Sequence, residues 1–130
     1  MAALSKILYV EDEPSIRMIA QIALETVGGF TLRTCSSGRE AMTPESIAFA
    51  PDIIVLDVML PEMDGPTILL HMRQIEAFAN TPVVFMTAKV QANEVGEYLD
   101  LGAIGVIPKP FDPMTLSSQL QEIWDARHLP

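Results

Sequence analysis

Cysteine and positive charge are both scarce in this chain of 130 residues. The single cysteine, Cys35, excludes an internal disulfide and favours a reducing compartment, so we expect a cytoplasmic protein. Eight lysines and arginines against seventeen aspartates and glutamates leave a net charge of −9, which argues against binding to nucleic acid or to an anionic membrane. The first apolar run is cut off by Glu11, far short of a membrane span.

Two familiar kinds of site are missing as well. The two histidines and one cysteine do not form a zinc-binding cluster, and no glycine-rich loop follows the first apolar run. The sequence therefore does not support a zinc site or a backbone cradle for phosphates. With 49% apolar residues, a chain of this length can still bury the core of one domain.

Short apolar runs recur along the chain and predict a buried parallel sheet. The runs are rich in β-branched residues and lack polar–apolar alternation, which is typical of strands covered by helices on both faces. They lie at residues 7–10, 53–56, 83–86 and 104–107. A fifth segment, residues 30–35, alternates and suits an edge strand.

Segments with helical spacing of apolar residues separate these strands. The first should start at Pro14 behind an acidic N-cap and stop at residues 28–29. The helix that Ser37 opens should be interrupted by Pro44, and the last helix should begin at residues 112–113. Strand and helix alternating five times predict a doubly wound five-stranded α/β domain, which binds ligands beyond the carboxyl ends of its strands.

Polar side chains follow four of the predicted strands. Glu11 and Asp12 follow the first strand, Asp57 follows the third and Thr87 the fourth, and Lys109 comes two residues after the fifth. Because the carboxyl ends of parallel strands share one edge of the sheet, these side chains should converge. Two unit charges ~4 Å apart repel by roughly 4 kcal/mol at an effective dielectric of about 20, so cations have to offset the carboxylates.

Lys109 supplies one cation, and a divalent ion bound through oxygen would supply more charge. Carboxylates, a backbone carbonyl and water suit Mg²⁺, which often shares its sites with phosphate oxygens. With the ion held by Asp12 and Asp57, and by Glu11 through water, one Asp57 oxygen is left to attack phosphorus. Lys109 would neutralise the transferred group and Thr87 would hydrogen-bond it, so the pattern predicts phosphoryl transfer to Asp57.

Four motifs in register resemble the receiver domains of bacterial response regulators, in particular the single-domain chemotaxis regulators. They are EDEP at residues 11–14, DVMLPEMDG at 57–65, TA at 87–88 and KPF at 109–111. The resemblance implies a (βα)5 flavodoxin-like fold with strand order 2-1-3-4-5. It also implies one receiver domain over residues 1–130, with a core of about 5–126, that serves phosphorelay signal transduction and is not an enzyme.

By the same resemblance, Asp57 is the phosphoacceptor of this domain. It would bind Mg²⁺ together with Asp12 and the backbone carbonyl of Met59, while Glu11 would act through water. The resemblance thus implies a magnesium-dependent aspartyl phosphate.

The resemblance assigns the catalytic and switch roles to Thr87 and Lys109. The Lys109–Pro110 peptide bond is expected to be cis. Val106 stands where many receivers carry a switch tyrosine or phenylalanine, so the familiar threonine–aromatic switch is in doubt here.

The implied partners are a sensor histidine kinase or a histidine phosphotransfer protein as donor, and an output protein that the sequence does not identify. The donor would dock near the start of the first helix (residues 14–18) and the loop at Pro110. We expect a monomer or a weak homodimer, with no nucleic acid and no membrane as partner. A free-standing receiver is favoured. Two alternatives stay open: a degenerate receiver that only binds proteins, and a receiver isolated from a larger multidomain regulator.

Overall fold

Five parallel strands form the centre of the computed structural model, which describes residues 3–88 and 91–127. Their order is β2-β1-β3-β4-β5, so the predicted order is confirmed and the predicted edge strand lies at an edge. The strands are β1 (Lys6–Val10), β2 (Thr31–Cys35), β3 (Ile53–Asp57), β4 (Val83–Thr87) and β5 (Gly105–Pro108).

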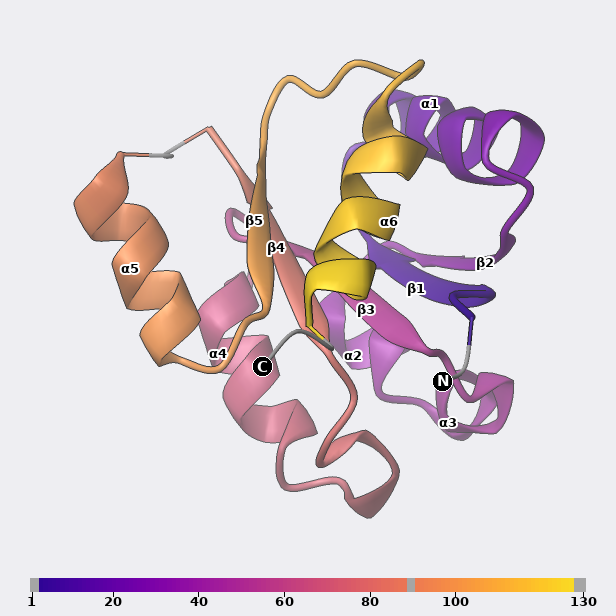
Figure 1. Ribbon diagram of the computed structural model, residues 1–130. Helices are drawn as coiled ribbons and strands as arrows, with labels where there is room; N and C mark the ends of the chain where they lie inside the picture. The colour runs from indigo at the N-terminus through magenta and orange to yellow at the C-terminus, as the bar shows by residue number, and fades with distance from the viewer. Residues whose placement is uncertain (1–2, 89–90, 128–130) are drawn as a thin grey trace.

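Helices cover both faces of the sheet, which gives three layers (Figure 1). One face carries α1 (Pro14–Gln21), the π-helix η1 (Ile22–Val27) and α6 (Leu116–Ala126). The other face carries α2 (Gly38–Ala41), α3 (Pro44–Phe49), α4 (Gly65–Met72) and α5 (Ala92–Asp100), and the short 3₁₀ helix η2 (Glu76–Phe78) follows α4. No helix within the described ranges is both long enough and apolar enough to cross a bilayer.

The central strands are buried on both faces, as their unbroken apolar runs predicted. Alternate residues enter different core clusters: Leu8 and Ile54 pack under α4, whereas Ile7 and Ile53 pack under α1 and α6. A strand needs apolar side chains at every position when helices cover both of its faces. The sheet therefore holds its carboxyl-end residues on a rigid support.

The first helix begins as predicted and then departs from α-helical geometry. Glu13 is its N-cap and accepts the Ser15 N–H at 2.9 Å, and Pro14 occupies the first helical position. From Ile22 the helix widens into η1, which the sequence analysis did not anticipate. Gly28 ends it so close to α6 that a Cβ at this position would collide with the Ser117 side chain. The N-terminal helical segment and α6 therefore pack in direct contact.

The interruption at Pro44 is confirmed, but the predicted start of the last helix is wrong. Thr43 caps α3 at Pro44, so α2 and α3 are separate short helices. The last helix begins at Leu116 and not at residues 112–113. Asp112 accepts the Met114 N–H at 2.8 Å and closes a turn before the helix. An aspartate followed by proline is equally suited to a turn and to a helix start, which explains the error.

Candidate functional site

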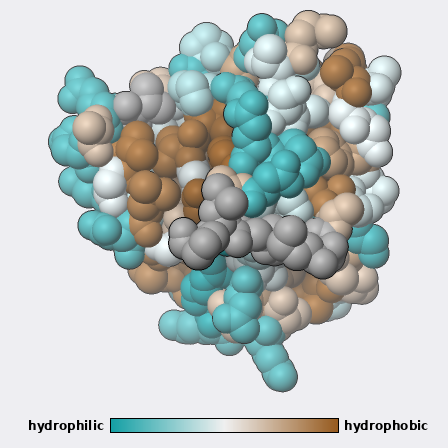
Figure 2. Space-filling view, viewed as in Figure 1, coloured by the Kyte–Doolittle hydropathy of each residue, from teal (hydrophilic) through white to brown (hydrophobic). Residues whose placement is uncertain are grey.

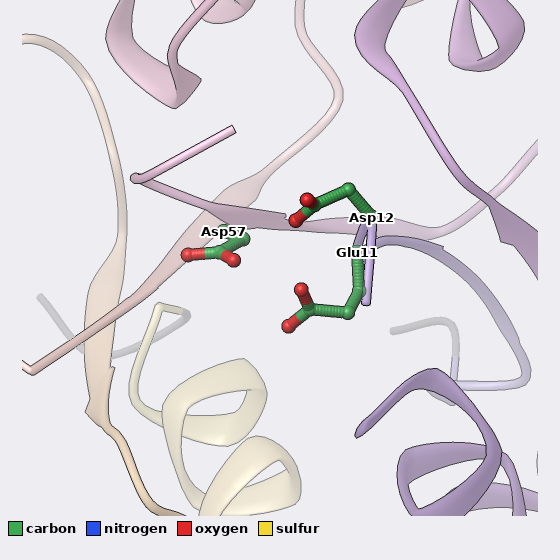
Figure 3. A group of neighbouring side chains, drawn as sticks. All are labelled: Glu11, Asp12 and Asp57. Atoms are coloured by element: carbon green, nitrogen blue, oxygen red, sulfur yellow. The ribbon is translucent and has the colours of Figure 1, made fainter. Parts of the chain in front are cut away.

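Three carboxylates meet at the carboxyl ends of β1 and β3 (Figure 3). Glu11 and Asp12 directly follow β1, and Asp57 is the last residue of β3. One carboxylate oxygen from each lies within 4.8 Å of the others. Glu11 and Asp57 are buried, whereas Asp12 is exposed. The predicted convergence of these three acids is therefore present, and such a cluster of hard oxygen ligands is typical of a receiver metal site.

Lys109 lies between the two buried acids. Its Nζ is 2.9 Å from the Glu11 Oε1 and 2.9 Å from the Asp57 Oδ2. Its backbone N–H donates to the Thr87 carbonyl at 2.9 Å, which ties the loop to the end of β4. The Lys109–Pro110 peptide bond is cis, as expected. One ammonium group is thus shared by two buried carboxylates.

The crowding of charges in the cluster shifts the pKa of Lys109 and the pKa of Glu11. Burial alone would lower the pKa of Lys109, but its hydrogen bonds to Asp57 and Glu11 outweigh burial and hold that pKa above 10.5. Burial raises the pKa of Glu11, and the Asp57 charge adds to this effect, while the Lys109 hydrogen bond offsets only part of it. Lys109 therefore remains a cation near neutral pH, in a site that still holds excess negative charge.

Main-chain contacts fix Asp57 within this cluster. The Met59 N–H donates to the Asp57 Oδ1 at 3.1 Å, and the Val58 N–H donates to the Met86 carbonyl on β4 at 3.0 Å. Gly65 packs so closely that a Cβ there would lie 2.7 Å from the Asp57 carbonyl oxygen. The two carboxylate oxygens of Asp57 therefore have different neighbours, a backbone amide on one and Lys109 on the other.

We expect Gly65→Ala to lower the free energy of unfolding by about 2 kcal/mol, because the added methyl group collides with main-chain atoms that cannot turn aside. Urea denaturation followed by circular dichroism measures this change. Gly96→Ala is the matched control, since a Cβ at Gly96 in α5 meets nothing within 4 Å. That control should stabilise the chain by about 0.5–1 kcal/mol through helix propensity. Equal effects of the two substitutions would contradict the close approach at Gly65.

The remaining predicted residues lie along the same edge or beside it. Thr87 ends β4, is buried, and pairs in register with Pro108. Val106 pairs with Phe85 and is half-buried against the core under α4 and α5, so an aliphatic residue fills the position of the expected aromatic switch. The side chain of Met59 is 68% exposed. The roles of Thr87 and of the Met59 carbonyl stay predictions.

One contact at the site was missed by the sequence analysis. The Arg17 Nη1 donates to the Glu11 carbonyl at 2.8 Å and to the Asp12 carbonyl at 3.3 Å. Arg17 thus holds the backbone of the acidic pair, whereas the sequence suggested for it only a part in docking. A cation on the first turns of a helix that follows an acidic loop is the signal that could have found this contact.

The family follows from comparison with known proteins. Residues 7–121 match the response regulator receiver domain family. The chain belongs to this family. As a receiver it is a module of two-component signalling rather than a conventional enzyme, and receivers interact with histidine kinases.

Relatives of this receiver include longer regulators and a protein of similar size. It is 37% identical over 118 residues to the alkaline phosphatase synthesis transcriptional regulatory protein PhoP of Bacillus subtilis, covering 91% of this chain and 48% of PhoP. It is 36% identical over 115 residues to the regulatory protein AtoC of Escherichia coli, covering 86% of this chain and 23% of AtoC. The solved chemotaxis response regulator CheY4 of Vibrio cholerae superimposes with a TM-score of 0.82 at 30% identity, covering 93% of this chain and 99% of CheY4. The chain spans less than half the length of PhoP and of AtoC.

Proposed function

We propose that this receiver accepts a phosphoryl group on Asp57 from a phosphohistidine, with Mg²⁺ bound beside it, and signals through contacts that depend on phosphorylation. The observation that carries this proposal is the position of Lys109, 2.9 Å from both Glu11 and Asp57. One cation therefore lies against Asp57 and against the neighbouring Glu11, and this supports the proposal because negative charge of a transferred group would develop there.

The transfer itself needs little covalent chemistry from the protein. An oxygen of Asp57 forms the new bond to phosphorus, the bond from phosphorus to the donor imidazole nitrogen breaks, and the imidazole leaves with that electron pair. Lys109 neutralises charge on the transferred oxygens, and its raised pKa supports this role because the ammonium persists at neutral pH. The Thr87 hydroxyl hydrogen-bonds the phosphoryl group. Phosphoryl transfer depends chiefly on such positioning and charge stabilisation.

The acidic cluster fits a magnesium ion. It offers three carboxylates within 4.8 Å, one of them exposed to solvent, and a main-chain segment at Met59 directly beside Asp57. Asp12, Asp57 and the Met59 carbonyl would hold the ion directly, and Glu11 would act through water. Mg²⁺, when bound, supplies positive charge to the phosphoryl oxygens.

An apolar pocket beside Lys109 supports docking of the donor. It has a volume of about 170 Å³ and is bordered by the following residues of α1 and the β5–α6 loop: Ile16, Ile19, Lys109, Pro110, Phe111 and Pro113. Of the pocket residues, Ile19 is 44% exposed, and Met18 on the same helix is 63% exposed. An apolar helix of a histidine kinase or a histidine phosphotransfer protein would bury these residues and bring its phosphohistidine to the acidic cluster.

A second apolar area supports contacts with an output partner. Figure 2 shows apolar side chains gathered between α5 and β5, on the side away from α1. On α5 and just after it, Leu99 and Leu101 are 44% and 42% exposed. We therefore assign output binding to the face formed by α5, β5 and α6. A monomer or weak homodimer and a cytoplasmic location stay predictions.

Intact-mass measurement after incubation with acetyl phosphate tests this function. We expect a gain of one phosphoryl group in the presence of Mg²⁺ and none when the metal is removed with EDTA. Reduction of the aspartyl phosphate with borohydride and peptide sequencing should place the modification at residue 57. Absence of any gain would contradict the proposal and favour a receiver that only binds proteins.

A further inference from the structure

A phenol that the proposed transfer does not use lies directly behind the acidic cluster. Tyr9 is 1% exposed. Within the described ranges its hydroxyl is the buried side-chain group that has no hydrogen-bond partner. Buried polar groups are nearly always paired, because an unpaired one loses its bonds to water and gains nothing in return. A partnerless donor at this position therefore requires an explanation.

The backbone directs Tyr9 toward Glu11. The Glu11 N–H donates to the Cys35 carbonyl at 3.0 Å, which continues the β1–β2 ladder past Val10. Side chains two residues apart in an extended chain point to the same side, so Tyr9 and Glu11 share a side. Burial raises the pKa of Tyr9, and the charges of Glu11 and Asp57 and the proximity of the Glu11 side chain raise it further. The phenol therefore keeps its proton and meets a carboxylate as a hydrogen-bond donor.

Glu11 has room for another donor. Its Oε1 accepts the Lys109 Nζ at 2.9 Å, while its Oε2 accepts only a long hydrogen bond of 3.3 Å from the Glu13 N–H. A carboxylate offers roughly four acceptor positions. Arg17, a second cation beside the acidic pair, is already bound to the Glu11 and Asp12 carbonyls. Lys109 is thus the main side-chain partner of this buried acid.

We propose that Tyr9 is a positioning residue, whose hydroxyl donates to the Glu11 carboxylate when Lys109 turns to the phosphoryl group. The inference rests on the proposed function, because phosphorylation of Asp57 is what draws Lys109 away. Glu11 would then lose its direct side-chain partner and keep only a water-mediated contact with Mg²⁺, and the Tyr9 hydroxyl replaces the direct partner without any proton leaving the phenol. In the resting state the hydroxyl lies beside Glu11 without a hydrogen bond of regular geometry, and the phosphorylated state supplies that bond.

The substitution Tyr9→Phe tests this role because it removes one oxygen and leaves the ring in place. In the unphosphorylated protein we expect the midpoint of urea denaturation to equal or exceed that of the wild type, since the lost hydroxyl had no partner. For Mg²⁺ with beryllium fluoride, a non-covalent mimic of the phosphoryl group, we expect the dissociation constant to rise about tenfold, as for loss of a hydrogen bond to a charged group. A residue with a merely structural role would instead lower the resting denaturation midpoint.

Tyr98→Phe is the matched control, because Tyr98 is the only other tyrosine and packs on Phe85 away from the acids. It should bind beryllium fluoride as the wild type does. In this variant, tyrosine labelled with ¹³C at Cζ reports Tyr9 alone, and its resonance should move when Mg²⁺ and beryllium fluoride are added.

The outcomes separate this inference from the proposed function. A wild type that gains no phosphoryl group overturns both. The positioning role alone is overturned if the wild type gains a phosphoryl group but the Tyr9→Phe variant binds beryllium fluoride with a dissociation constant within twofold of the wild-type value. A Tyr9 resonance whose chemical shift does not change when Mg²⁺ and beryllium fluoride are added also overturns the positioning role.

Discussion

Asp57→Asn is expected to abolish phosphoryl labelling and to leave the chain folded. The amide keeps the size of the carboxylate, and its oxygen can still accept the Met59 N–H. The amide is a far weaker nucleophile than the carboxylate, and it cannot form a stable acyl phosphate. Intact mass after incubation with acetyl phosphate and Mg²⁺ should show only the unmodified protein, and circular dichroism should match that of the wild type.

Asp100→Asn is the control for this loss. Asp100 is an exposed aspartate at the end of α5, so its replacement removes the same charge from the chain at a distance from the cluster. The control should gain one phosphoryl group at the wild-type rate. Full labelling of the Asp57→Asn protein would show that another side chain is the acceptor.

Lys109→Met should lower the free energy of unfolding by about 3 kcal/mol, because it leaves Glu11 and Asp57 buried without their shared cation. Methionine retains most of the aliphatic stem, so packing changes little. Urea denaturation at neutral pH measures the loss. Mg²⁺ should restore stability by a larger amount in the variant than in the wild type, because the ion then replaces the positive charge that Lys109 gave to the two acids.

An exposed lysine gives the comparison for that variant. Lys6 contacts the Phe49 carbonyl at 3.3 Å at the opposite end of β1, and Lys6→Met should change stability by less than about 0.5 kcal/mol. If Lys109→Met were as stable as Lys6→Met, the ion pairs at the site would contribute little to the resting fold. Labelling of the Lys109 variant by acetyl phosphate should also be strongly slowed.

Much of the fold was predictable because the composition of the central strands indicates that both of their faces are buried. Residues 53–56 are apolar at every position, and a strand of that kind is stable only with helices on both faces. The widening at Ile22 could not be predicted, since it accompanies the close contact of Gly28 with Ser117, a residue far along the chain. Local patterns hold no information about such a contact.

The site was predictable to the same extent. Glu11, Asp57 and Lys109 follow strand ends, and a parallel sheet brings such positions together whatever their distance in sequence. The sharing of the Lys109 ammonium between Glu11 and Asp57 was not predictable, because it depends on side-chain positions within a few ångströms. The sequence predicted Tyr9 only as a residue of a buried strand. It could not predict a role for the hydroxyl, because the ring is buried whether or not the hydroxyl forms a hydrogen bond.

The two edges of the sheet have a consequence for how molecules of this protein meet at high concentration. β5 is four residues long and ends in Pro108, which has no N–H to offer a further strand, and α6 packs onto it through Ile123 against Gly105. β2 carries the charged Arg33, which is bound to Ser46. Short edges with proline or charge are poor templates for strand addition. Polymerisation by continuing the sheet from one molecule into the next is therefore disfavoured at both edges, and association is left to the helical faces.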